Sequence, residues 1–148
     1  MQVRDIMTKN VVSVSPETRI GEVAHILTEK RFHGLPVAEN GKLVGIIVED
    51  DFFVKDQSNF HLPSYINFIE KSGEVKRSLG KDEEKIEKLL NVRAKDIMTS
   101  ECLSFSPQMK IEDVIKIFKE TRINTFPVVD EKNNIVGIIT LADVLNLI

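Results

Sequence analysis

The sequence has little cysteine and no long apolar run, and each of these absences excludes a class of protein. The single cysteine, Cys102, cannot form an intramolecular disulfide and suits a reducing compartment. No stretch approaches the roughly 20 apolar residues that are needed to span a bilayer. The first ten residues also lack the apolar segment of a secretion signal. These absences predict a cytoplasmic protein that makes no use of a membrane.

Positive charge and catalytic patterns are missing as well. A net charge of -3 gives no basic surface for nucleic acid, so no nucleic-acid partner is expected. We find no Gly-rich phosphate loop, no order of residues that suggests a catalytic triad, and no Cys/His cluster with metal-binding spacing. The sequence therefore predicts that the protein is not an enzyme and holds no metal.

What the sequence does contain is an internal repeat of roughly 50 residues. The tetrapeptide "DIMT" occurs at 5–8 and again at 96–99, and "SVSPETRIGEVAHI" is followed 91 positions later by "SFSPQMKIEDVIKI". The stretch "LPVAENGKLVGII" likewise returns as "FPVVDEKNNIVGII", with one extra residue in its turn. These matches divide the chain into a first repeat (1–53), a connector (54–94) and a second repeat (95–148).

Both repeats show the same order of elements. A strand pattern, "VVSVS" or "CLSFS", ends at Pro16 or Pro107. A helix with apolar residues at 3–4 spacing follows, then two strands joined by a turn, and then a final helix beginning near Asp50 or Ala142 and running on to Ile148. In the first repeat the turn is Asn40-Gly41, which favours a tight hairpin. We predict a mixed α/β (α+β) fold in which two β-α-β-β-α repeats pack as a pseudo-twofold pair.

The connector has no counterpart elsewhere in the chain. It is not rich in Gly or Ser, so a flexible linker is not expected. Pro63 marks one helix start, and the acids at 82–84 mark the first turn of another. We predict a helical insert of two short helices that dock on the repeats.

The end of the second repeat, "GIITLAD", carries the clearest chemistry. Thr140 precedes a helix start, where free backbone N–H groups favour an anion, and its hydroxyl can donate to a phosphate. Asp143 can accept two hydrogen bonds, the number that a ribose diol donates. The same two residues are also spaced as a capping box, which needs no ligand. Both interpretations stay open at this point.

The combined pattern resembles the CBS domain, a module that occurs in tandem pairs. The resemblance rests on "DIMT" in both repeats, on the Ser-Pro turns at 15–16 and 106–107, on "HGLPV" and "NTFPV", and on "GIIVEDD" and "GIITLAD". It covers everything except about 54–94. The resemblance implies two clefts between the repeats that bind adenosine-containing ligands, namely AMP, ADP, ATP or S-adenosyl compounds, with no further cofactor required. It also implies a homodimer.

Transferred residue by residue, the resemblance implies a main cleft and a second one. For the main cleft it names Thr140, Asp143, Lys9, Asn10, Val11, Phe32, His33, Gly34 and Pro36. For the second cleft it names Asp51, Ser100, Cys102, Ile123, Asn124, Thr125 and Pro127. In the main cleft, Lys9, Arg31 or His33 would balance phosphate charge.

The second cleft departs from the family pattern. Val48 stands where Thr140 stands in the other repeat, Asn124 replaces the counterpart of His33, and Glu101 adds negative charge. We therefore expect the main cleft to be the phosphate-binding one.

Two functions remain in competition. One is a regulatory sensor that binds an adenosyl ligand and passes the signal to a separate effector protein, and the other is a structural dimerisation module with empty clefts. The sequence does not choose among the adenosyl ligands, nor does it identify the effector.

Overall fold

The computed structural model describes residues 1–49 and 91–148, in which two antiparallel hairpins alternate with helices. In chain order the elements are α1 (Val3–Ile6), α2 (Ile20–Lys30), β1 (Gly34–Glu39), β2 (Lys42–Val48), α7 (Ala94–Ile97), α8 (Ile111–Glu120), β3 (Thr125–Val129), β4 (Ile135–Thr140) and α9 (Leu141–Leu145). The predicted mixed class of helices and strands is confirmed. The helices expected in the connector and near Asp50 lie outside the described residues.

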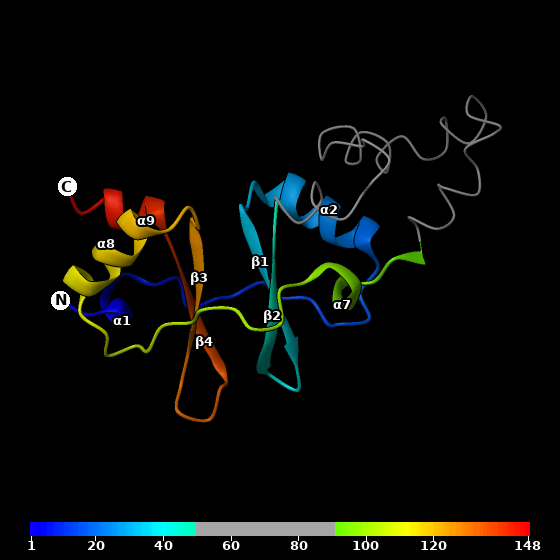
Figure 1. The fold of residues 1–148 in the computed structure, drawn as a ribbon, viewed down its shortest axis with the longest axis horizontal. Coiled ribbons are helices and arrows are strands. Elements are labelled where there is room, and N and C mark those ends of the chain that lie inside the picture. The colour runs from blue at the N-terminus through cyan, green and yellow to red at the C-terminus, as the bar shows by residue number, and fades with distance from the viewer. Residues whose placement is uncertain (50–90) are drawn as a thin grey trace.

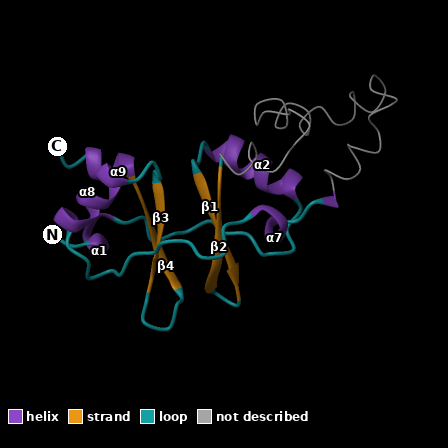
Figure 2. Ribbon diagram, in the orientation of Figure 1, coloured by secondary structure: helices purple, strands orange, loops and turns teal. Residues whose placement is uncertain are grey.

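The two hairpins, β1–β2 and β3–β4, stand side by side in the middle of the molecule, and the helices flank them on both sides (Figures 1 and 2). Their turns are tied together, because Leu43 N donates to Asn133 O at 3.0 Å and Asn133 Nδ2 donates to Leu43 O at 2.8 Å. Asn40 and Gly41 have φ angles of 55° and 80°, as the predicted tight turn requires. The hairpins are thus held together at one end of the strands.

Helices α2 and α8 are the helices that the 3–4 spacing predicts. Val23 and Leu27 of α2 are buried against the first hairpin, and Ile111 and Val114 of α8 are buried against the second. Arg31, the residue after α2, caps the helix: its backbone is left-handed (φ 55°), and its N–H donates to Leu27 O and Thr28 O. This turn directs the chain from the helix into β1.

Full strands were expected over "VVSVS" and "CLSFS". In the structure each segment forms only one parallel bridge, Val14 with Val37 and Phe105 with Val128. The prediction of full strands is wrong for a physical reason. The facing strands contain Pro36 and Pro127, which have no N–H to donate to a longer ladder. The final helix is also shorter than predicted, because α9 ends at Leu145 and Ile148 is 98% exposed.

Each short helix of the "DIMT" segments belongs to the core of the other repeat. Val3 of α1 is fully buried in the core of the second repeat, beside Phe126 and Ile139. Ala94 of α7 is fully buried in the core of the first repeat. After α1 the chain pairs with β4, where Thr8 and Ile138 exchange two backbone hydrogen bonds of 2.9 Å. The two repeats therefore exchange their first segments.

Gly137 makes this exchange possible, because its missing side chain leaves room for Met7. A Cβ at Gly137 would lie 2.9 Å from Met7 Cγ and 3.2 Å from the carbonyl oxygen of Thr8. We expect Gly137→Ala to lower the free energy of unfolding by about 1–3 kcal/mol in urea denaturation. Gly41→Ala is the control, since nothing lies within 4 Å of its Cβ and only its positive φ is strained. Because that φ lowers stability on its own, the clash is tested by repeating Gly137→Ala in a Met7→Ala background, where the loss should be smaller. An equal loss in both backgrounds would contradict the expected clash.

Candidate functional site

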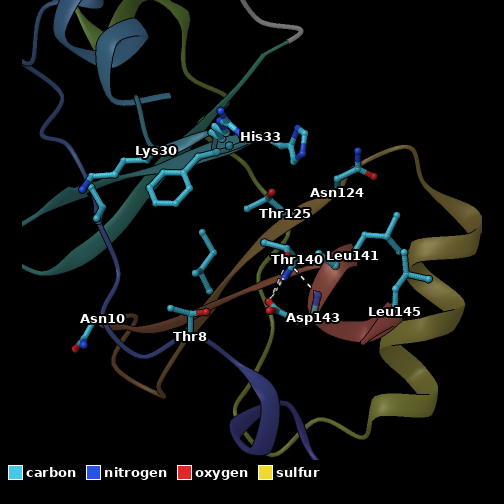
Figure 3. Close-up of a pocket in the computed structure, with 16 residues that line it drawn as sticks. Thr8, Asn10, Lys30, His33, Asn124, Thr125, Thr140, Leu141, Asp143 and Leu145 are labelled. Atoms are coloured by element: carbon cyan, nitrogen blue, oxygen red, sulfur yellow. Dashed lines mark hydrogen bonds between the residues drawn. The ribbon is translucent and has the colours of Figure 1, made fainter. Parts of the chain in front are cut away.

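A pocket of about 540 Å³ lies between the two repeats, at the end of the hairpins opposite their turns (Figure 3). Its first wall comes from the segment after α1 and from the end of α2 with the start of β1. Its second wall comes from the starts of β3 and α9 and from the end of β4. The volume is in the range of pockets that hold a small organic ligand. Residues from both repeats therefore meet at one site.

Six of the nine residues assigned to the main cleft line this pocket: Thr140, Asp143, Asn10, Phe32, His33 and Gly34. Lys9 and Val11 do not line it, whereas Thr8 and Val12 do. The chain bends at Lys9 and Asn10, where Val11 N donates to Lys9 O at 3.1 Å, so the strand opening expected here is not extended. Pro36 is also absent from the lining, and it is fully buried.

The residues assigned to the second cleft are distributed differently. Asn124 and Thr125 line the same pocket as Thr140, on the side that faces His33. Ser100 and Cys102 follow Thr99, which pairs with Ile46 of β2, so they lie beside the first hairpin. Ile123 is 42% exposed, Pro127 is fully buried and Asp51 lies outside the described residues. Two residues expected on the opposite side of the pair thus belong to the lining of the first pocket.

Thr140 and Asp143 form the helix cap that the sequence offered as an alternative. Thr140 N donates to Asp143 Oδ2 at 2.8 Å, and the Thr140 hydroxyl donates to the same oxygen at 3.0 Å. In return, Asp143 N donates to Thr140 Oγ1 at 3.3 Å. No hydrogen bond joins Asp143 Oδ1 to any described residue. The cap is therefore real, and it leaves one carboxylate oxygen available at the pocket.

The backbone at the start of α9 is less open to an anion than the sequence suggested. Leu141 N donates to Asn124 O at 2.9 Å, and Asp143 N is taken up by the cap. These bonds satisfy donors that a helix start otherwise leaves free. An anion in the pocket would therefore have to be held mainly by side chains.

Three basic side chains line the pocket: Lys30, Arg31 and His33. His33 Nδ1 lies 3.7 Å from Glu49 Oε2, and both side chains are largely exposed. Lys30 and His33 reach the pocket from opposite ends (Figure 3). Lys30 was missed by the sequence analysis, although its place in the last turn of a predicted helix next to the "HGLPV" segment could have indicated it.

The described residues also include the single cysteine, Cys102. Burial raises the pKa of the Cys102 thiol, which keeps it in its unreactive protonated form. Within 1–49 and 91–148, no three His, Cys, Asp or Glu side chains are grouped so that they could bind a metal ion. None of the helices in these two stretches has the length and apolar character to cross a bilayer.

Two repeats with exchanged first segments, side-by-side hairpins and an interface pocket define a tandem module. The chain belongs to the CBS domain family, whose family model matches residues 3–56 and 94–148. It is thus a CBS pair, as the resemblance in the sequence indicated.

Known relatives extend over nearly the whole chain. The uncharacterized protein MJ1426 of Methanocaldococcus jannaschii is 30% identical, covering 98% of this chain and 89% of that protein. The crystal structure of protein MJ1225 from the same organism has a TM-score of 0.77 at 28% identity, covering 99% of this chain and 47% of that one. The crystal structure of CBSX2 from Arabidopsis thaliana in complex with AMP has a TM-score of 0.70 at 26% identity, covering 99% and 94%. Several other relatives are longer, and this chain covers 22% to 45% of their length.

Proposed function

We propose that the chain is a non-catalytic, cytoplasmic sensor module that binds an adenosine-containing ligand and passes the signal to a separate partner protein. The ligand would be AMP, ADP, ATP or an S-adenosyl compound, and no other cofactor is required. The observation that carries the proposal is the free Oδ1 of Asp143, a hydrogen-bond acceptor at the edge of a pocket of about 540 Å³. The complex of the similar protein CBSX2 with AMP supports the choice of ligand.

The lining offers a partner for each part of such a ligand. Phe32, Val12 and Ile138 present apolar surface to a purine ring. Asp143 can accept the two hydroxyls of a ribose through the two lone pairs of Oδ1, because Oδ2 already accepts two hydrogen bonds from Thr140. His33 lies on the side of Thr140 and Asn124 and can face a phosphate there when it is protonated.

The proposal is tested by measuring the thermal stability of the protein with AMP, ATP, S-adenosylmethionine and adenosine in turn. A ligand that binds only the folded state at 100 times its Kd adds about 2.7 kcal/mol to the free energy of unfolding. We expect at least one adenine nucleotide to raise the melting temperature in a concentration-dependent way. If no member of the panel does so, the module is a structural dimerisation unit with an empty pocket.

We also propose that the protein is a homodimer that associates through its helices. Leu145 is 55% exposed, and Leu147, just beyond α9, is 42% exposed. Exposed apolar side chains at the end of the chain favour association, although Leu145 also lines the pocket. Light scattering at high micromolar concentration should give twice the mass of the chain, and a strictly monomeric mass would contradict the dimer.

A further inference from the structure

Thr125 holds the one buried hydroxyl in the pocket wall that has no hydrogen-bond partner among the described residues. Its side chain is 2% exposed and lines the pocket, yet Oγ1 makes no hydrogen bond. A buried polar group without a partner is unfavourable, and such groups are rare in folded proteins. The hydroxyl therefore calls for an explanation that the fold alone does not supply.

The strand register places this hydroxyl next to the cap. Thr125 of β3 is paired directly with Thr140 of β4, so the two side chains lie on the same face of the hairpin. In the first repeat the corresponding pair is Gly34 with Val48. The second repeat thus presents two hydroxyls side by side, whereas the first repeat presents none at the equivalent place.

Gly34 makes room for Thr125 across the interface between the repeats. A Cβ at Gly34 would lie 3.2 Å from Thr125 Cβ and 3.3 Å from Val48 Cγ1. A side chain at position 34 would therefore crowd the side chain of Thr125. The Thr125 hydroxyl can line the pocket beside Thr140 because the other repeat has a glycine at position 34.

We propose that Thr125 is a specificity-determining residue of this pocket, whose hydroxyl donates a hydrogen bond to an anionic phosphate group of the ligand. This inference rests on the proposed function. Oγ1 is buried in the pocket wall, so it would reach a phosphate by rotation about χ1. The rotation breaks no hydrogen bond, because Oγ1 makes none. A phosphate is the fitting partner because it only accepts hydrogen bonds, and the Thr140 hydroxyl beside Thr125 already donates to Asp143 Oδ2. A phosphate on this side of the pocket would also face His33.

The test compares Thr125→Val, which keeps the shape and removes the hydroxyl, with Thr125→Ser, which keeps the hydroxyl. Calorimetry measures the affinity of each variant for AMP and for adenosine, and thermal melts measure the ligand-free proteins. For Thr125→Val we expect AMP affinity to fall roughly tenfold, the lower end of what a hydrogen bond to a charged group contributes. We expect adenosine affinity and ligand-free stability to be kept. Thr125→Ser should bind AMP nearly as tightly as the natural protein.

The outcomes separate this inference from the function on which it rests. If the natural protein binds AMP and Thr125→Val binds it equally well, the role of Thr125 is refuted and the sensor function stands. Equal losses for AMP and adenosine would refute the contact with phosphate. A lower melting temperature for ligand-free Thr125→Val would show that the hydroxyl has a partner inside the free protein, which also refutes the inference. If the natural protein binds no adenine compound, the proposed function fails, and the inference fails with it.

Discussion

Replacing Asp143 by alanine is expected to weaken AMP binding by roughly 100-fold or more in calorimetry. The carboxylate would accept two ribose hydroxyls, and each hydrogen bond to a charged group contributes about 1.5–3 kcal/mol. The sum of about 3–6 kcal/mol corresponds to a factor of roughly 10² to 10⁴ in Kd. Adenosine should lose affinity to the same extent, because the ribose is common to both ligands.

Asp143 also caps α9, so the loss of a cap must be separated from the loss of a ligand contact. Asp5 is a matched control, since it occupies the same position in α1 and accepts a hydrogen bond from Gln2 N at 2.7 Å, but it does not line the pocket. Asp143→Ala and Asp5→Ala should each lower the free energy of unfolding by about 1 kcal/mol. Only Asp143→Ala should lose affinity for AMP.

Asp51, the counterpart of Asp143 in the first repeat, provides the second comparison. Asp51→Ala should leave the tighter AMP site nearly intact, because the strand before it ends in Val48 where the other ends in Thr140. If Asp51→Ala proves more damaging than Asp143→Ala, the nucleotide binds on the other side of the pair. Thr140 and Asp143 would then serve only as the helix cap.

The parts of the fold that were predictable from the sequence are those that depend on local periodicity. Helices α2 and α8 follow from their 3–4 spacing, and the first hairpin follows from Asn40-Gly41. The exchange of first segments was not predictable. The apolar residues Val3 and Ala94 show that each short helix is buried, but two similar repeats offer two similar cores. Local pattern cannot decide between them.

The site was predictable where a sequence motif lies at the end of a strand, as at Thr140 and Asp143. It was not predictable where the answer depends on which way a side chain points. Lys9 and Val11 were named because the resemblance places the opening of the first strand in the cleft. In the structure the chain is fixed by the pairing of Thr8 with Ile138, and Thr8 and Val12 line the pocket instead. Thr125 was assigned to the other cleft because the resemblance implies that the segment before "FPV" faces the strand ending of the other repeat. The hairpin register pairs Thr125 with Thr140 and so places it in the same pocket.

The exchanged segments also connect the pocket to the two cores. The chain leaves the core of the second repeat at Met7, lines the pocket with Thr8, Asn10 and Val12, and enters the core of the first repeat at Val14. The segment 8–12 thus leads directly from one core to the other, and a ligand in the pocket would contact it. A substitution in α1, just before this segment, should therefore lower the stability of the second repeat.

Replacing Val3 by aspartate is expected to destabilise the second repeat more than the first, although Val3 belongs to the first repeat in sequence. Val3 is fully buried among Phe105, Phe126 and Ile139, and its N–H donates to Met109 O at 2.9 Å. A carboxylate placed there without a partner should cost roughly 3–5 kcal/mol, a large share of the stability of a small domain. Amide hydrogen exchange should show faster exchange in 105–144 before 20–47 responds. Arg4→Asp is the control, because Arg4 lies next to Val3 in the same helix but is exposed. Equal loss of protection in both repeats, or earlier loss in the first, would contradict the assignment of α1 to the core of the second repeat.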